Sequence, residues 1–278
     1  MNVVYFGTDV FLSCFEYFLK RHRVLALYTY HNDEDYFTEY AIVRRARQMG
    51  IPVHYEDIAP EEIERLFRRE GCGLLFIAEY NRILPIPEGL DNFRGINTHS
   101  SLLPDGRSYY PIEGAMDRRL GVTGVTMHKV TSRLDGGDIL AQRTVEITGE
   151  TDSVDLYLKC AAAARDMLET IMSDLDGAWA RAVPQAGRTP YWRRPETARL
   201  SLDHSQTTAQ AAQVFRRYNS LSQARLGGRW YYVTALTPGT AQMEEQERQL
   251  SQGRWLYRTA DGHLRLCVHP MPEKEDTR

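Results

Sequence analysis

Short apolar runs alternate with amphipathic stretches along the first part of the chain. The runs have the length and composition of buried strands, and the stretches repeat apolar positions at helical spacing. The run at 73–78 is apolar throughout, as expected of a parallel strand buried on both faces. The alternation predicts an α/β fold with a doubly wound sheet. The expected strands are Val3–Gly7, Arg23–Tyr30, Pro52–Tyr55 and Gly73–Ala78, and the expected helices are Val10–Lys20, Glu39–Gln48 and Pro60–Glu70.

The same pattern continues to about residue 186. A strand is followed by a helix, two β-rich segments and a long helix whose alanine run indicates close packing on the sheet. Asp152 or Ser153 suits the N-cap of that long helix, because either side chain can accept a hydrogen bond from its first turn. We therefore expect one domain over residues 1–186. These elements are Phe93–His99, Ile112–Arg119, Gly121–Thr131, Gly137–Ile147 and Asp152–Leu175.

The last part of the chain has a different pattern. Residues 187–202 contain two prolines and are typical of a linker. Residues 203–278 predict a small α+β module with a barrel-like sheet, ending in a polar stretch, 272–278, that we expect to be disordered. Its expected elements are a helix at Thr207–Tyr218 and strands at Arg229–Leu236, Arg254–Arg258 and His263–Val268.

Amino-acid composition and net charge narrow the classes of function that fit the chain. Hydrophobic residues make up 42% of the chain and charged residues 26%, as in an ordinary globular protein, and the net charge of -3 gives no general attraction to nucleic acid or anionic membrane. The cysteines are scattered without a CxxC pair, which suggests reduced thiols of a cytoplasmic enzyme. Neither a leader nor an apolar run of bilayer length is visible, and the histidines have no metal-ligand spacing. Gly7-Thr8 is not a GxGxxG fingerprint, so we expect no nicotinamide cofactor.

Candidate chemistry lies at the end of the strand Phe93–His99. Side chains alternate along a strand, so Asn97 and His99 share one face. Open α/β sheets bind their ligands at the carboxyl ends of strands. There an amide can donate to a developing oxyanion and an imidazole can accept a proton, so the pair suits acyl transfer. On its own, N-x-H is a weak signal, equally compatible with a polar strand end.

Several motifs in order make the signal specific. With them, the chain resembles the formyltransferases that take a one-carbon unit from 10-formyltetrahydrofolate, a family that includes methionyl-tRNA formyltransferase, glycinamide ribonucleotide transformylase and sugar-nucleotide N-formyltransferases. The resemblance implies a Rossmann-like catalytic domain, 10-formyltetrahydrofolate as co-substrate, no metal, and catalytic roles for Asn97, His99 and Asp135, with Asp138 structural. The motifs are Phe6-Gly7-Thr8, Asn97-Thr98-His99, Ser101-Leu102-Leu103-Pro104, Gly124-Val125-Thr126 and Asp135-Gly136-Gly137.

The resemblance also implies binding residues. The segment after the strand Gly73–Ala78 would line the folate pocket, together with residues beside Asp135. Near Pro104, two tyrosines stand where many relatives have small residues; they could stack on a base or sugar, or simply pack under the next helix. The implied folate contacts are Tyr80, Asn81, Arg82, Ile83, Leu84, Arg133 and Leu134, and the candidate substrate contacts are Arg107, Tyr109 and Tyr110.

The acceptor is a small-molecule amine on this interpretation. The acidic loop His31–Phe37 stands where tRNA-directed relatives have a longer basic loop, which disfavours nucleic acid, although the loop can equally be a solvated turn. With a tail resembling that of enzymes formylating amino-sugar nucleotides, this favours a nucleotide-linked amino sugar. An amino acid or hydroxyornithine, as in siderophore pathways, is the next alternative, and methionyl-tRNA the third. A non-catalytic folate- or nucleotide-binding protein, a folate hydrolase and a homodimer all remain open.

Overall fold

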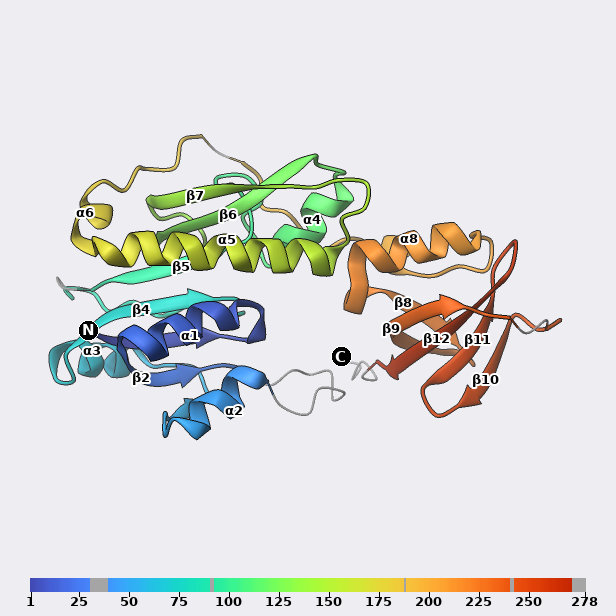
Figure 1. Ribbon diagram of the computed structural model, residues 1–278, viewed down its shortest axis with the longest axis horizontal. Coiled ribbons are helices and arrows are strands. Elements are labelled where there is room, and N and C mark those ends of the chain that lie inside the picture. Colours follow the sequence, from blue (N-terminus) through green and yellow to red (C-terminus); the bar gives the residue numbers. More distant parts are fainter. Residues whose placement is uncertain (31–39, 91–92, 188, 241–242, 272–278) are drawn as a thin grey trace, which may run out of the picture. The chain divides into compact units, whose positions relative to one another are not determined.

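The computed structural model describes residues 1–30, 40–90, 93–187, 189–240 and 243–271 (Figure 1). The acidic loop His31–Phe37 and the tail 272–278 lie outside the described residues. The chain forms two compact units, one built mainly from residues up to Arg193 and one mainly from Arg194 onward. We call them unit 1 and unit 2 and describe each by itself.

Unit 1 contains a seven-stranded sheet in the order β3-β2-β1-β4-β5-β6-β7. The first five strands in this order are parallel, and the last two are antiparallel to their neighbours. The order reverses between β1 and β4, which creates the topological switch point of a doubly wound fold. The expected fold class is confirmed, with an antiparallel pair at one edge. The strands are β1 Asn2–Gly7, β2 Arg23–Tyr28, β3 Val53–His54, β4 Cys72–Ala78, β5 Gly95–His99, β6 Val122–Lys129 and β7 Ile139–Glu146.

Helices cover both faces of this sheet (Figure 1). One core joins Phe15, Ile42 and Leu168 from three helices to the sheet, and the other packs Ile63 of α3 against Leu75 of β4. The helices are α1 Leu12–Arg21 after the 3-10 turn η1 Asp9–Phe11, then α2 Ala41–Gln48, α3 Pro60–Arg68, α4 Pro111–Asp117, α5 Ser153–Ser173 and α6 Leu175–Ala180.

Unit 2 is an antiparallel sheet in the order β10-β11-β12-β9-β8 with α8 packed on it through Ala211. The expected helix and three strands are present. Two strands were not expected, because β8 has four residues and β10 is polar and largely exposed. The elements are α7 Thr197–Leu200, α8 Thr208–Tyr218, η2 Asn219–Leu221, β8 Gln223–Leu226, β9 Arg229–Pro238, β10 Glu247–Ser251, β11 Arg254–Arg258 and β12 His263–Pro270.

Residues inside the expected linker make specific contacts within unit 1. The Trp192 N–H donates to the Arg107 carbonyl at 3.0 Å, and the Arg118 guanidinium lies 4.4 Å from the Trp192 ring. A Cβ on Gly114 would come within 2.3 Å of that ring, so α4 needs a glycine there. Residues around Trp192 are therefore packed against α4.

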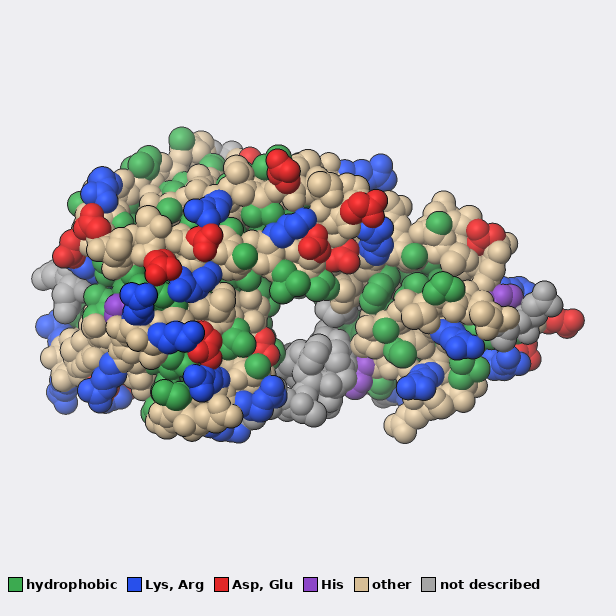
Figure 2. All heavy atoms as spheres, in the orientation of Figure 1, with side chains coloured by type: hydrophobic (Ala, Val, Ile, Leu, Met, Phe, Trp, Pro, Cys, Tyr) green, Lys and Arg blue, Asp and Glu red, His purple; other side chains and the backbone are tan. Residues whose placement is uncertain are grey.

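Charged side chains of both signs are interspersed over the face of unit 1 shown in Figure 2, in line with the small net charge. No helix among the described residues is long and apolar enough to cross a bilayer.

A capping box begins α8. The Gln210 N–H donates to the Thr207 hydroxyl at 3.2 Å, and the Thr207 N–H donates to Gln210 Oε1 at 2.8 Å. Thr207→Ala removes the first bond and should lower the protection of the α8 amides by about 1 kcal/mol in native-state hydrogen exchange. Gln213→Ala, an exposed change in the same helix, serves as the control. Equal protection in the two variants would contradict the assigned cap.

Candidate active site

Asn97 and His99 lie at the carboxyl end of β5, between parallel β4 and antiparallel β6. Asn97 stands opposite His128 of β6, and His99 stands opposite Thr126. Because cross-strand partners share a sheet face, the register brings a second imidazole beside the Asn97 amide. His99 and His128 are both buried.

Asp135 reaches the same place from the loop between β6 and β7. Its φ of 48° lies in the left-handed region, which turns the chain sharply and leaves the buried carboxylate beside β5. Two residues later the loop passes so close to β6 that a Cβ on Gly137 would lie 1.8 Å from the Lys129 carbonyl oxygen. Only glycine fits there, which explains the second glycine of the Asp-Gly-Gly sequence.

The Asn97 amide joins the carboxylate to the second histidine. Asn97 Nδ2 lies 3.2 Å from Asp135 Oδ1 and 3.0 Å from His128 Nε2. Since a carboxylate only accepts, the NH2 group must face it, and one of its protons then serves His128. His128 Nδ1 lies 2.9 Å from the Lys129 carbonyl and therefore carries the ring proton, leaving Nε2 as acceptor.

His99 is oriented by a backbone carbonyl. Its Nε2 donates to the Gly106 carbonyl at 2.8 Å, so the neutral ring carries its proton there. Its Nδ1 lies 3.8 Å from Asp135 Oδ1, which is too long for a hydrogen bond. The Gly106 carbonyl therefore holds the His99 ring in its orientation. Asp135 instead faces the ring nitrogen that is free to take a proton.

Burial and neighbouring groups shift the pKa values of His99 and Asp135. Burial lowers the pKa of His99 below its ordinary value of 6.5, and the opposing influence of Asp135 does not restore it. Burial alone would raise the pKa of Asp135, but His99, His128 and the Ser108 N–H outweigh it and hold that pKa below its usual range. A carboxylate therefore faces a neutral imidazole.

A second network holds the Asp135 loop. The Ser108 N–H donates to Asp135 Oδ2 at 3.2 Å. The Gln185 amide donates to the carbonyls of Asp135 and Gly137 at 2.7 and 2.8 Å. Its oxygen accepts from Arg107 Nε and Nη2 at 3.2 and 2.6 Å. Gln185 thus fixes the loop and also satisfies a buried arginine.

The Ser-Leu-Leu-Pro loop is fixed by one hydroxyl. Thr126 Oγ1 donates to the Ser101 carbonyl at 2.6 Å and accepts from the Leu103 N–H at 3.1 Å. The Gln142 amide reaches both Thr126 Oγ1 and the Leu103 carbonyl. The Gly-Val-Thr strand therefore anchors the loop that follows His99, which gives a physical reason for the two motifs to occur together.

Comparison with known proteins assigns this arrangement to a family. A family model described as formyl transferase matches residues 38–172. Methionyl-tRNA formyltransferase of Chromobacterium violaceum is 30% identical over 188 residues, which cover 66% of this chain and 61% of that protein. The chain therefore resembles the formyl transferase family over residues 38–172. It spans about three-fifths of the length of this curated relative.

Solved structures share the formyl transferase fold. HypX from Aquifex aeolicus, in complex with tetrahydrofolic acid, superposes with a TM-score of 0.67 at 14% identity, covering 95% of this chain and 43% of that one. The N-formyltransferase from Helicobacter canadensis, in complex with folinic acid and dTDP-3-aminofucose, gives 0.62 at 16% identity, covering 96% and 98%. At these identities the likeness concerns the fold.

The expected folate contacts follow the carboxyl end of β4 or lie in the Asp135 loop. Tyr80 packs on Phe6 with ring centroids 5.3 Å apart, and its hydroxyl is buried without a hydrogen-bond partner in the described structure. Ile83 is 60% exposed, whereas Leu84 is buried in the core. Arg82 is bound to Asp57. Asn81 and Arg133 are exposed, and the Leu134 carbonyl accepts from the Tyr191 hydroxyl at 3.2 Å.

The expected substrate contacts differ in their exposure to solvent. Tyr109 is 49% exposed and Tyr110 is half-buried just before α4. Arg107 is buried, with two guanidinium nitrogens bound to Gln185. Asp138 Oδ2 lies 3.4 Å from Lys129 Nζ.

Two residues of the candidate active site were not predicted from the sequence. His128 could have been found, because it follows Thr126 at alternate positions of a strand whose other positions, Val125 and Met127, are apolar. Gln185 had no such signal, since it lies in an irregular segment distant in sequence from Asp135.

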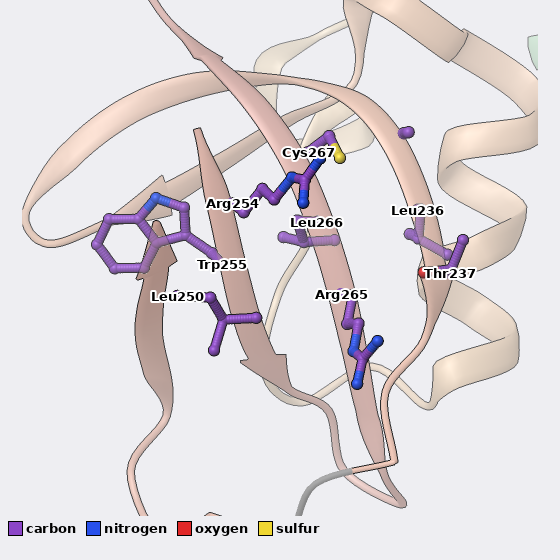
Figure 3. Close-up of a pocket in the computed structure, with 9 residues that line it drawn as sticks. Leu236, Thr237, Leu250, Arg254, Trp255, Arg265, Leu266 and Cys267 are labelled. Carbon is purple, nitrogen blue, oxygen red and sulfur yellow. The ribbon is translucent and has the colours of Figure 1, made fainter. Parts of the chain in front are cut away.

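A separate hollow of about 170 Å³ lies on the sheet of unit 2 (Figure 3). Leu236, Leu250 and Leu266 line it, with Trp255 and two arginines at its walls. It has no carboxylate, so proton-transfer chemistry is assigned to unit 1. No three His, Cys, Asp or Glu side chains of the described residues are placed to hold a metal ion.

The two ionisation states can be tested by NMR. The His99 ring should titrate below 6.5, and Asp135→Asn should lower that pKa further, because the carboxylate stabilises the protonated ring. Asp138→Asn, the same change in the same loop, should leave it unchanged. A His99 pKa above 6.5, or a rise in Asp135→Asn, would contradict this electrostatic account.

The Gln185 network predicts that Gln185→Leu alone destabilises the protein more than Gln185→Leu combined with Arg107→Met. Gln185→Leu leaves the buried Arg107 guanidinium without its hydrogen-bond acceptor and should lower the free energy of unfolding, measured in urea, by about 1–3 kcal/mol. Adding Arg107→Met removes this unpaired group and should recover part of the lost stability. Strictly additive effects of the two changes would show that the contact carries no coupling.

Proposed function

We propose that the chain transfers a formyl group from 10-formyltetrahydrofolate to a primary amine. The observation that carries this proposal is the buried group of Asn97, His99 and Asp135, in which a carboxylate faces a neutral imidazole with a free nitrogen. The match of residues 38–172 to the formyl transferase family model supports it. So do the relatives of the same fold whose structures contain tetrahydrofolic acid or folinic acid.

His99 acts as the proton acceptor in this proposal. As the amine attacks the formyl carbon, its N–H proton passes to His99 Nδ1, the ring nitrogen not committed to Gly106. The ring becomes a cation next to the Asp135 carboxylate, which stabilises it. When the carbon–nitrogen bond to the folate breaks, the proton passes to the leaving folate nitrogen, which returns His99 to its neutral state.

Asn97 stabilises the oxygen that becomes negative during attack. One amide N–H is held by a charge-assisted bond to Asp135, which fixes the group in place. The other N–H faces His128 Nε2, so in this proposal the oxyanion shares that donor with His128. A donor already positioned in a buried site lowers the barrier more than one that must be ordered during the reaction.

The segment 80–84 fits the pterin of the folate. None of its backbone groups bonds to the backbone of another described residue, so its donors and acceptors can pair with a heterocycle edge. The unpartnered Tyr80 hydroxyl and the exposed Ile83 side chain add a polar and an apolar contact. Leu134, beside Asp135, would approach from the other side.

Two acceptor classes fit a formyl transferase of this kind. A nucleotide-linked amino sugar is supported by the Helicobacter canadensis relative, whose structure holds dTDP-3-aminofucose. A free basic amino acid or hydroxyornithine is favoured by two carboxyl groups at the same sheet edge, the partly buried Glu79 and the buried Glu113. Methionyl-tRNA, the substrate named for the Chromobacterium violaceum relative, ranks third.

Release of tetrahydrofolate from 10-formyltetrahydrofolate tests the activity directly. The panel holds amino-sugar nucleotides, ornithine, N-hydroxyornithine, glycinamide ribonucleotide and methionyl-tRNA. Amine-dependent release with a formylated product is the expected outcome. Formate release without any amine would identify a hydrolase, and folate binding without turnover of any acceptor would favour a binding protein.

The catalytic residues can be tested with the acceptor that turns over. His99→Ala or Asp135→Ala should lower kcat by about 10²–10⁴, the usual contribution of positioned acid–base groups, while the fold persists. Asp138→Ala provides the control in the same loop. Turnover at the wild-type rate in both His99→Ala and Asp135→Ala would remove the mechanism.

A further inference from the structure

The second polar group of unit 1 lies at the topological switch point of the sheet. Parallel β4 ends at Ala78 beside the end of β1, where doubly wound folds leave a crevice for ligands. The next residue, Glu79, has a φ of 60°, so the chain turns sharply there. A glutamate rarely adopts this conformation, and no hydrogen bond within the described residues accounts for it.

Glu113 on α4 is the second carboxyl group. It is 6% exposed, and the Tyr157 hydroxyl of α5 donates to its Oε1 at 3.2 Å. Its Oε2 is buried and lacks a hydrogen-bond partner in the part of the chain that the structure describes. An unpaired buried oxygen of this kind costs free energy unless a ligand satisfies it.

Glu113 lies close enough to Glu79 for its charge to raise the pKa of Glu79. Burial and the charge of Glu113 raise the pKa of Glu79 to about 7, and burial raises the pKa of Glu113. Among the described residues, no lysine or arginine lowers the pKa of either carboxyl. Such a pair needs either a shared proton or a positive charge to be stable.

A third unsatisfied atom belongs to β5. Thr98 is 4% exposed, and its Oγ1 has no partner among the described residues. Thr98 shares its sheet face with Ile96, which packs in one core with Ile112, the neighbour of Glu113 on α4. It also pairs with Ala78, the residue before Glu79. A hydroxyl and two carboxyls are thus gathered on one side of the carboxyl edge.

We propose that Glu79, Glu113 and Thr98 form a subsite for a second, non-reacting ammonium group of the acceptor, which is therefore a diamine or a basic amino acid. This inference rests on the proposed formyl transfer. Three oxygen acceptors satisfy an ammonium group, which has three donors. Asn97 and His99 occupy the opposite face of β5, so a ligand reaching both sites passes over the sheet edge with its two nitrogens separated by a chain.

Matched acceptors isolate the second ammonium group. Ornithine is compared with 5-aminopentanoate, which lacks only the α-ammonium, and 1,4-diaminobutane is compared with butylamine. In the wild type, kcat/KM should be about 10- to 100-fold higher for the doubly aminated member of each pair, as hydrogen bonds to a charged group provide. Glu113→Gln and Glu79→Gln should each reduce this ratio toward one.

Glu61→Gln is the control, because Glu61 is an exposed glutamate on α3, a helix of the other core. It should keep the wild-type ratio. Because the ratio compares acceptors within one variant, partial loss of folded protein does not change it. If Glu113→Gln does not fold, the partly buried Glu79→Gln decides the question.

Direct binding separates the subsite from the activity. Calorimetry with 1,4-diaminobutane alone should show binding to the wild type and to Glu61→Gln, and loss of binding in Glu113→Gln or Glu79→Gln. Formyl transfer to amino-sugar nucleotides with equal kcat/KM within each amine pair would overturn the subsite and leave the proposed function standing. If nothing is formylated, absence of diamine binding would overturn the subsite as well.

Discussion

The ionised carboxylate of Asp135 is the constraint on which the candidate active site depends. A buried charge needs donors, and here they come from separate parts of the chain: the Asn97 amide of β5 and the Ser108 N–H before α4. The loop that carries it needs a left-handed residue, a close glycine and the Gln185 amide. Loss of any of these would leave a charge buried without support, so the motifs form one physical unit.

Much of the fold and part of the candidate active site could be predicted from the sequence. Apolar periodicity located the strands of the parallel sheet, and strand alternation placed Asn97 and His99 together. The antiparallel register that adds His128 depends on how β6 pairs with β5, which no local pattern specifies. Gln185 lies far along the chain in a segment without regular structure, and only the folded state reveals its hydrogen bonds. The short strand β8 and the polar strand β10 were not predicted for a related reason: they are defined by pairing with neighbouring strands and not by a hydrophobic pattern.

The sheet edge offers two chemically different surfaces separated by one strand. On one face of β5, hydrogen bonds hold the Asn97 amide and both imidazoles in place, and His99 keeps one ring nitrogen free beside the Asp135 carboxylate. On the other face, polar atoms lack partners within the described residues. A site that performs proton transfer benefits from order before the substrate arrives, whereas unsatisfied groups gain their partners only on binding. The difference between the two faces of β5 therefore fits proton transfer on one face and substrate recognition on the other.

The segment that matches the family model, residues 38–172, cuts across the sheet of unit 1. It lacks β1 and β2, which lie between β3 and β4 in the sheet, and it ends before Gln185 and Trp192. Excised at those limits, the segment would keep Asn97, His99 and Asp135 but lose the two strands that join β3 to the rest of the sheet. The boundaries of the sequence match therefore differ from the boundaries of the folded sheet. Truncated variants should be designed to keep all strands of the sheet.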